Sequence, residues 1–232
     1  MGGAMKFLVI SDLHAAEGAV EKLESQFAEA DGVLFAGDFA ECFKPDTGLA
    51  ALERLCRAHG TIFAVLGNCD SPDFIGELEE HDISVEKSLV FHEGLAFAGS
   101  GGGSFFTGKT EFERTEEELL SDFDIVRNSV AESGDASLYR SLILISHNPP
   151  KDTKCDAVNA ELHAGSGKFA EFIREMQPLA VVTGHIHEGR GIDRIGDTVI
   201  VNPGALAEGH YAWLDVSRDS GGGWKAAAAL GA

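Results

Sequence analysis

Seven side chains able to bind a metal ion each come shortly after an apolar run in the sequence. They are carboxylate, carboxamide and imidazole groups, namely Asp12, His14, Asp38, Asn68, His147, His185 and His187. Oxygen and nitrogen ligands of this mixed kind suit Mn, Fe, Zn and related divalent ions. Seven ligands exceed what one ion needs, so we predict a two-ion site with Asp38 as the shared ligand. Such a site activates water for the hydrolysis of a phosphate ester.

Each of these residues has an ordinary structural alternative when it is taken alone. Asp12 or Asp38 could cap a helix, and Asn68 could form a turn. A single histidine more often makes a structural hydrogen bond than binds a metal. The shared placement after apolar runs therefore favours ligation. The remaining histidines lack that placement and are interpreted as structural: His59, His81, His92 and His210.

The apolar runs themselves are predicted to be strands that alternate with helices. In the first seventy residues the pattern indicates strands at 6–11, 33–36 and 61–66, with helices at 17–30 and 49–59. This alternation predicts parallel strands joined by helical crossovers. Ligand sites of open α/β sheets lie beyond the carboxyl ends of the strands. The seven side chains are therefore expected to converge on one edge.

The rest of the chain continues with strands and helices. The pattern predicts helices at 74–80, 115–129 and 168–176, and strands at 88–91, 95–98, 141–145, 179–182, 198–201 and 211–216. The glycine-rich segment 99–103 lacks the lysine of a P-loop and is interpreted as a flexible rim. Beside it, Phe106 and Thr107 could form a pocket wall, or the phenylalanine could simply pack. We predict one domain over 1–232, with a core at about 6–216 and a loop-like tail at 217–232.

The composition excludes several classes of protein. Hydrophobic residues make up 44% of the chain and charged residues 24%, which is ordinary for a globular protein. The formal net charge of -20 opposes binding to nucleic-acid phosphates. No apolar run approaches the roughly 20 residues that cross a bilayer, so no membrane span is predicted.

The cysteine pattern indicates the redox environment. Cys42, Cys56, Cys69 and Cys155 are irregularly spaced and form no CxxC pair. This argues against a disulfide framework and against a structural zinc knuckle. A reducing, cytoplasmic location is therefore predicted.

Short blocks around the candidate ligands resemble the ordered signature of the calcineurin-like metallophosphoesterases, in particular their small prokaryotic single-domain branch. The blocks are Asp12-Leu13-His14, Gly37-Asp38, Gly67-Asn68-Cys69-Asp70, Ser146-His147 and Gly184-His185-Ile186-His187. They occur in the family's order over about residues 6–216. The resemblance implies an α/β fold, a four-layer α/β/β/α sandwich of two mixed sheets flanked by helices, with the second half of the chain supplying the second sheet.

The resemblance also implies how the ligands divide between two divalent ions. It gives one ion Asp12, His14 and His187, and the other Asn68, His147 and His185. Asp38 serves both. Manganese is the first choice of metal, with Fe, Zn and Ni as alternatives.

One position departs from the family's common pattern. Cys69 stands where many members have a histidine that protonates the leaving oxygen, and a neutral thiol does this poorly. His163 or water could donate the proton instead, or none is needed for a good leaving group. The segment 162–166 is similar to stretches near the metals in small members, so His163 and Ser166 are candidate substrate contacts. Ser166 could alternatively cap a helix.

These observations assign roles to the residues. The catalytic set is Asp38, Asn68, Cys69, Asp70 and His163, and the substrate-binding set is Ser166, Phe106 and Thr107. We predict a metal-dependent phosphoesterase that hydrolyses a small phosphate ester, a phosphodiester before a monoester, through a two-metal-activated hydroxide. The alternative is a catalytically silent metal-binding scaffold for protein interaction. The oligomeric state, a homo-oligomer included, is left open.

Overall fold

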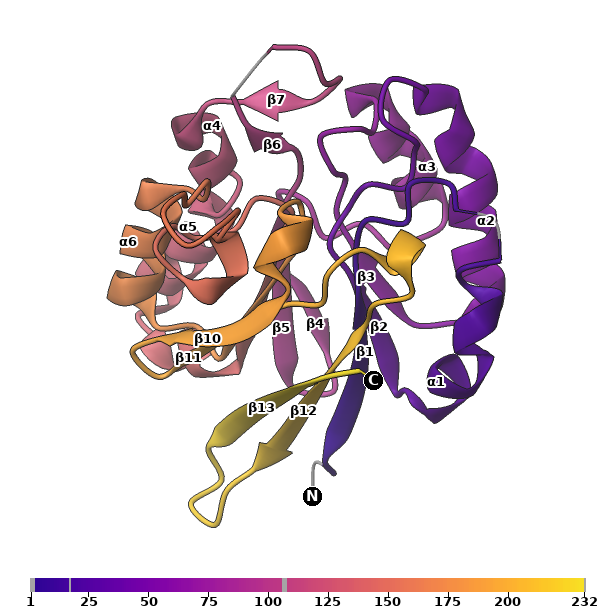
Figure 1. The fold of residues 1–232 in the computed structure, drawn as a ribbon. Coiled ribbons are helices and arrows are strands. Elements are labelled where there is room, and N and C mark those ends of the chain that lie inside the picture. The colour runs from indigo at the N-terminus through magenta and orange to yellow at the C-terminus, as the bar shows by residue number, and fades with distance from the viewer. Residues whose placement is uncertain (1–2, 17, 106–107, 232) are drawn as a thin grey trace.

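A five-stranded sheet is built mainly from the N-terminal part of the chain in this computed structural model, which describes residues 3–16, 18–105 and 108–231 (Figure 1). Its strand order is β13-β12-β1-β2-β3. The bounds are β1 Met5–Ile10, β2 Gly32–Phe35, β3 Ile62–Ala64, β12 Ala212–Arg218 and β13 Trp224–Leu230. β1, β2 and β3 are parallel, whereas β12 and β13 are antiparallel to their neighbours.

A six-stranded sheet formed by strands between residues 90 and 202 packs against the first, so its first two strands precede the second half of the chain that the resemblance implied. Its order is β10-β11-β9-β8-β5-β4. The bounds are β4 Val90–His92, β5 Leu95–Ser100, β8 Leu142–Ser146, β9 Ala180–Thr183, β10 Gly191–Ile195 and β11 Thr198–Asn202. The inner strands are parallel, and β4 and β10 form antiparallel edges. A separate short pair joins β6 Gly103–Ser104 to β7 Glu113–Arg114.

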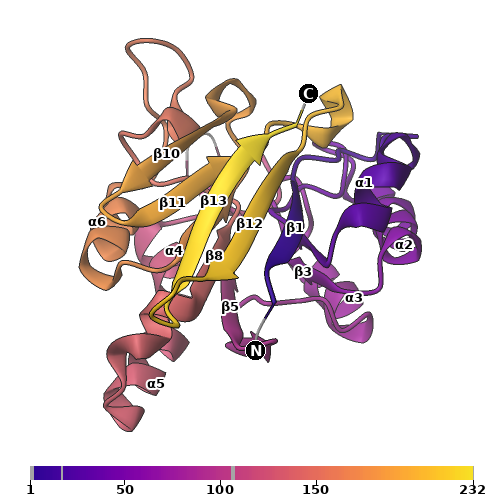
Figure 2. The same ribbon diagram turned by 90° about the horizontal axis from the view of Figure 1, so that it is seen from below.

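Helices cover the outer face of each sheet. α1 Glu24–Glu29, α2 Gly48–Ala58 and α3 Ile75–Glu80 lie beside the first sheet. α4 Glu116–Ser121, α5 Asp124–Ser133 and α6 Gly167–Met176 lie beside the second, as the view from below shows (Figure 2). The four-layer α/β/β/α fold implied by the resemblance is confirmed.

Three apolar cores hold these layers together. The alternation along β1 shows the principle, because Phe7 and Val9 face the second sheet while Leu8 and Ile10 face the helices of the first. A third core joins the second sheet to α5 and α6 through Phe123 and other side chains. Strands covered on both faces must be apolar throughout, which is why β1 reads as a continuous apolar run.

The C-terminal prediction is wrong, because the tail forms strand β13. It pairs with β12 across a turn in which Asp219 Oδ1 accepts hydrogen bonds from the amides of Gly221 and Gly223. Trp224 donates its indole N–H to Gly94 O and stacks under Arg218. This alanine-rich segment carries no strand signal of its own, because pairing and not side-chain pattern places it in the sheet.

Other elements differ from the predicted ranges. The predicted helix at 115–129 is two helices that meet at residues 122–123, and Thr115 caps the first of them through a capping box with Glu118. The predicted helix at 17–30 is reduced to α1 and a preceding turn. Strand β10 was not predicted. Part of the predicted flexible rim lies in β5, where Gly99 packs against Val65.

Among the helices described, none combines the length and the apolar character that crossing a bilayer requires.

Candidate metal centre

The seven predicted ligands meet at one end of the two sheets. Each follows a strand: Asp12 and His14 follow β1, Asp38 follows β2, Asn68 follows β3, His147 follows β8, and His185 and His187 follow β9. Asp12, Asp38, Asn68 and His147 are buried, and the other three are partly exposed. The carboxyl ends of parallel strands from both sheets thus bring together residues far apart in the sequence.

One group of ligand atoms surrounds Asp12. His187 Nε2 lies 3.3 Å from Asp12 Oδ1, and His14 Nε2 lies 3.8 Å from the same oxygen. The two imidazole Nε2 atoms are 3.3 Å apart. The ligand atoms of these three residues all lie within 4.8 Å of one another, a group that can hold a metal ion.

A second group surrounds His147. Its Nε2 lies 3.0 Å from Asn68 Oδ1 and 3.5 Å from Asp38 Oδ2, while its Nδ1 lies 2.6 Å from Ala36 O. The His185 ring packs edge-on against the His147 ring at 5.1 Å between centroids. The hydrogen bond to Ala36 orients the imidazole so that Nε2 faces the other ligands.

Asp38 stands between the two groups. Its Oδ2 atom lies 3.7 Å from His14 Nε2 and 3.5 Å from His147 Nε2. Its Oδ1 atom accepts a 2.8 Å hydrogen bond from the backbone N–H of Cys69. One carboxylate oxygen therefore faces the imidazoles of both groups, and the other fixes the side chain.

The ligand loops have unusual backbone conformations. Asp12, His14, Asp38 and His185 have φ values of 55°, 46°, 63° and 68°. Residues other than glycine seldom adopt this left-handed region, although aspartate and histidine do so more often than most, and each such residue costs about 1 to 3 kcal/mol. Such strain clusters at functional sites, where the surrounding structure enforces it.

Two glycines make room for the carboxylates. A Cβ atom at Gly67 would lie 1.9 Å from Asp38 Oδ1, and one at Gly184 would lie 2.7 Å from Asp12 Oδ2. A side chain at Gly67 would thus collide with a predicted ligand, and one at Gly184 would collide with the Ser11 hydroxyl at 1.9 Å as well as with Asp12.

Asp70 supports the loops from beneath. It is fully buried and accepts hydrogen bonds from the amides of Asp38, Phe39, Ala40 and Gly67, at 2.7 to 3.3 Å. These hydrogen bonds hold the loops that carry Asp38 and Asn68, and the catalytic role of Asp70 stays a prediction.

The electrostatics of the centre fit bound cations. Burial raises the pKa of Asp38 to about 7, and the negative charge of Asp12 adds to the effect. Burial also opposes ionisation of Asp12, but its hydrogen bond to His187 and the positive charges of His147 and His187 lower its pKa overall. Burial, with repulsion from His147, lowers the pKa of His185 to about 3 and keeps this imidazole neutral for ligation. Buried carboxylates close to imidazole nitrogens form the donor set that divalent ions require.

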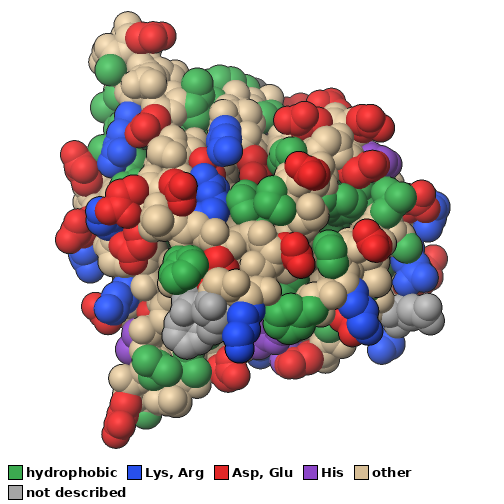
Figure 3. Space-filling model, turned by 90° about the horizontal axis from the view of Figure 1, so that it is seen from above, with side chains coloured by type: hydrophobic (Ala, Val, Ile, Leu, Met, Phe, Trp, Pro, Cys, Tyr) green, Lys and Arg blue, Asp and Glu red, His purple; other side chains and the backbone are tan. Residues whose placement is uncertain are grey.

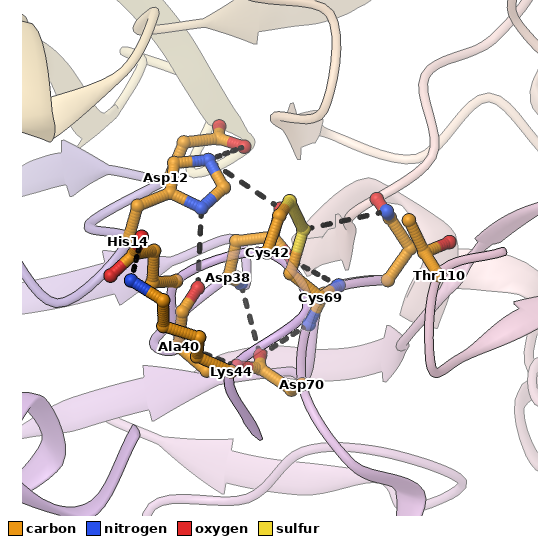
Figure 4. The surroundings of a disulfide bond; sticks show 12 residues. Asp12, His14, Asp38, Ala40, Cys42, Lys44, Cys69, Asp70 and Thr110 are labelled. Carbon is orange, nitrogen blue, oxygen red and sulfur yellow. Dashed lines mark hydrogen bonds and ion pairs between the residues drawn. A yellow bond between two sulfur atoms is a disulfide. The ribbon is translucent and has the colours of Figure 1, made fainter. Parts of the chain in front are cut away.

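A disulfide joins Cys69 to Cys42 beside this centre (Figure 4). The prediction drawn from the cysteine spacing is wrong for this pair, because the two residues lie on loops that only the fold brings together. Cys56 and Cys155 are free thiols. As a disulfide, Cys69 cannot serve as the acid that replaces the usual histidine.

A cavity of about 450 Å³ adjoins the predicted ligands Asn68 and His185. Its wall is largely apolar and includes Phe105, Val158, Leu162 and Ile186, with His163 among them. Phe105 and Leu162 are 67% and 52% exposed, so this wall presents apolar surface to the cavity. The predicted contacts Phe106 and Thr107 lie outside the described residues.

His163 and Ser166 have different positions. His163 Nδ1 lies 2.7 Å from Oδ1 of the buried Asp156, which leaves Nε2 as the nitrogen available to a substrate. Ser166 is 2% exposed, and its hydroxyl accepts a hydrogen bond from the amide of Phe169 at the start of α6. The structure therefore favours the capping alternative for Ser166.

Two supporting residues were not identified from the sequence as parts of the site. Asp156 also accepts hydrogen bonds from the amides of Thr153 and Gly165, and its capping-box spacing with Thr153 was the available signal. Asn202 is fully buried and donates its amide to the carbonyl oxygens of Cys155 and Ile186, which ties the His185–His187 loop to β11.

Two of the histidines interpreted as structural, His59 and His81, contact backbone carbonyl groups. The imidazole of His59 contacts the carbonyl oxygens of Thr61 and Ala30, and that of His81 contacts Glu77 O. His210 Nδ1 instead lies 3.5 Å from Glu208 Oε2, and the other oxygen of that carboxylate lies 3.9 Å from His187 Nδ1. The view from above shows acidic side chains spread over this end of the molecule, with hydrophobic side chains between them (Figure 3). Such a surface repels polyanions.

Comparisons with known proteins agree with the geometry. Residues 5–219 match the family model described as the calcineurin-like phosphoesterase superfamily domain. The chain is 30% identical to the uncharacterized protein MJ1162 of Methanocaldococcus jannaschii over 207 residues, which cover 86% of this chain and 88% of that one. The protein TT1561 of Thermus thermophilus has a similar fold, with a TM-score of 0.68, 21% identity and coverage of 91% and 94%. The phosphopantetheinyl hydrolase of Mycobacterium tuberculosis has a TM-score of 0.60, 16% identity and coverage of 90% and 92%.

Proposed function

The chain belongs to the calcineurin-like phosphoesterase superfamily, and from that premise we propose that it hydrolyses a small phosphate ester with the help of two divalent metal ions. The observation that carries the proposal is the position of Asp38, whose Oδ2 faces the imidazoles of both His14 and His147. The family is metal-dependent and acts on small phosphate esters. The number of ions and the substrate are the parts proposed here.

The proposed ligand sets follow the two groups of side chains. Asp12, His14 and His187 would hold one ion, and Asn68, His147 and His185 the other, with Asp38 shared. Bound there, divalent ions lower the pKa of water and offset the charge of the phosphoryl group. Manganese is proposed as the first metal, because the set contains carboxylate, amide and imidazole donors without a thiolate.

His163 is proposed to protonate the leaving oxygen. It lines the same cavity as Asn68 and His185, and its hydrogen bond to Asp156 raises its pKa, which favours the protonated imidazole. Asp156 also fixes the ring, because its oxygens accept from backbone amides on either side of His163 in the sequence. His163 would then supply the proton that a histidine at position 69 supplies in many family members.

The substrate is proposed to carry an apolar alcohol on a phosphodiester. The phosphoryl group would sit at the ligands, and the adjoining cavity of about 450 Å³ has room for a small alcohol group. Contact of such a group with the exposed side chains of Phe105 and Leu162 would remove apolar surface from water and so favour binding. The acidic surface and net charge of -20 disfavour a nucleic-acid substrate. The cytoplasmic location stays a prediction.

The test is hydrolysis of p-nitrophenyl phosphate and its bis-ester by protein stripped with a chelator. Mn, Fe(II), Zn or Ni is then added back in separate reactions. We expect metal-dependent turnover with a preference for the bis-ester. A preference for the monoester would indicate a phosphatase. Absence of hydrolysis by protein that holds two ions would support the scaffold alternative.

The matched variants are Asp38→Ala and Asp46→Ala, the second at an exposed position outside the centre. Asp38→Ala should lose both turnover and bound metal, as measured by elemental analysis, whereas Asp46→Ala should keep them. Full activity and intact metal content in Asp38→Ala would overturn the proposal.

A further inference from the structure

The Cys42–Cys69 disulfide lies against two of the proposed metal ligands. The sulfur atoms of Cys42 and Cys69, a ring nitrogen of His14 and a carboxylate oxygen of Asp38 all lie within 4.8 Å of one another. Figure 4 shows these side chains gathered in one place. The four residues come from the loops after β1, β2 and β3, so the fold assembles them.

We propose that Cys42 and Cys69, once reduced, form with His14 and Asp38 a four-ligand site for a thiophilic divalent cation such as Zn²⁺. Disulfide sulfurs carry no thiolate charge, so this site exists only in the reduced protein. The inference rests on the proposed function for the roles of His14 and Asp38. It adds that the redox state of the cysteine pair selects the metal.

The spacing of the ligand atoms suits a tetrahedral ion. Bond lengths of about 2.3 Å to sulfur and about 2.0 to 2.1 Å to nitrogen or oxygen place neighbouring ligand atoms roughly 3 to 4 Å apart. The ligand atoms in the structure already lie within 4.8 Å. Opening the disulfide lets the two sulfurs separate into such positions with small changes elsewhere.

A dithiol can serve as the reductant of the Cys42–Cys69 disulfide, with electrons and protons balanced. The S–S bond between Cys42 and Cys69 accepts two electrons and two protons, and the dithiol becomes a disulfide. Each cysteine thiol then releases its proton to solvent when it binds the ion. Cys42 is partly exposed and Cys69 is buried, so Cys42 is the sulfur that a reductant can reach.

The two metal states compete for the same residues. In the oxidised protein, His14 and Asp38 offer nitrogen and oxygen donors, which suit manganese. In the reduced protein, two thiolates join them and favour zinc. An ion held by the thiolates would occupy His14 and Asp38, so phosphoester hydrolysis with manganese is expected to fall on reduction in the presence of zinc.

Cobalt(II) is the probe that tests the site, because thiolate-to-cobalt charge transfer absorbs in the near ultraviolet and reports ligation directly. A phosphine is the reductant, since it is oxidised to the phosphine oxide with oxygen from water and adds no competing thiol. We expect the band in the reduced wild-type protein and in reduced Cys56→Ser, but not in the oxidised protein or in reduced Cys42→Ser. Cys56→Ser is the matched control because Cys56 is the other partly exposed cysteine.

Three outcomes would overturn the inference. One is cobalt binding without the band after reduction, and another is a band that persists in Cys42→Ser. The third is that all four cysteines of the untreated protein react with an alkylating reagent when the protein is denatured without a reductant. That result would show that no disulfide forms. Loss of phosphoester hydrolysis with every metal would count against the proposed function alone, because the cobalt band is read without a substrate.

Discussion

His163 Nδ1 lies 2.7 Å from Oδ1 of Asp156, a carboxylate that is fully buried while the imidazole lines the cavity beside the metal ligands. This pairing resembles the general acid arrangement in which a carboxylate fixes the tautomer and orientation of a histidine. The proton donor proposed for this cavity therefore does not depend on Cys69.

Replacing His163 by glutamine should lower turnover by an amount that depends on the leaving group of the ester. An alkyl phosphodiester leaves as a basic alkoxide and needs a proton, so its turnover should fall by about 10² to 10³. A p-nitrophenyl ester needs none and should change only a few-fold. Steady-state rates on both esters measure the difference. His81→Gln, at a histidine bonded only to Glu77 O in its own helix, is the control and should leave both rates unchanged. Equal losses on both esters in His163→Gln would contradict a role as acid.

The pH dependence of the alkyl ester provides a second test. The hydrogen bond to Asp156 raises the pKa of His163 above 6.5, and the acid acts in its protonated form. Activity on the alkyl ester should therefore decline as pH rises through that raised pKa. Asp156→Asn should move the decline to lower pH because it removes the negative charge. An unmoved pH profile in the folded variant would argue that another group is the acid.

Gly67→Ala should abolish metal binding. Its Cβ would lie 1.9 Å from Asp38 Oδ1 and 2.3 Å from Asp38 N, so the shared ligand must move. Bound metal and turnover should fall together, as measured by elemental analysis and hydrolysis. Gly76→Ala is the matched control, since it lies in α3 with nothing within 4 Å of its Cβ, and it should keep both properties. Normal metal content in Gly67→Ala would contradict the close packing.

In the metal-free protein, Asp70 should contribute stability that is lost as pH rises from about 4 to about 7, whereas His185, whose pKa is lowered to about 3 in the folded state, contributes in the opposite direction. Burial, with repulsion from Asp38, raises the pKa of Asp70 to about 7, so the folded state binds a proton that the unfolded state releases near pH 4. The folded state is therefore favoured at low pH, and this contribution is gone above pH 7. Each unit of pKa difference corresponds to about 1.4 kcal/mol.

Denaturant unfolding of chelator-treated protein at several pH values measures this effect. The free energy of unfolding of the wild-type protein relative to that of Asp70→Asn should fall across the same window, because only the wild-type protein has this titrating group. The amide oxygen of the asparagine can still accept some of the backbone hydrogen bonds. A slope in Asp70→Asn as steep as that of the wild-type protein would assign the effect to other groups.

Leu162→Ser should weaken the use of esters with apolar groups. Leu162 is 52% exposed on the cavity wall, where an aryl group would bury it. We expect kcat/KM for bis(p-nitrophenyl) phosphate to fall roughly tenfold, and that for methyl p-nitrophenyl phosphate to change less. Leu49→Ser, at an exposed leucine on α2, should change neither value. An equal fall in kcat/KM for the two esters would show that the alcohol group does not bind against Leu162.

The sequence by itself determined which strands are buried and placed the candidate ligands directly after them. Strands buried on both faces must be apolar, and side chains that follow them must gather at one end of a parallel sheet. For that reason Asp12, Asp38, Asn68, His147 and His185 could be identified from their positions. Helix ends were less accurate, as at 115–129, because capping and packing place them.

Only the tertiary structure decided the relationships between distant segments. The Cys42–Cys69 bond, the support of Asp70 beneath the ligand loops and the pairing of His163 with Asp156 all depend on loops that the fold brings together. Strand β13 has the same origin, because its alanines carry little pattern of their own and gain their place by hydrogen bonding to β12. Local patterns encode which residues are buried, whereas contacts across the sequence depend on the geometry of the packed sheets.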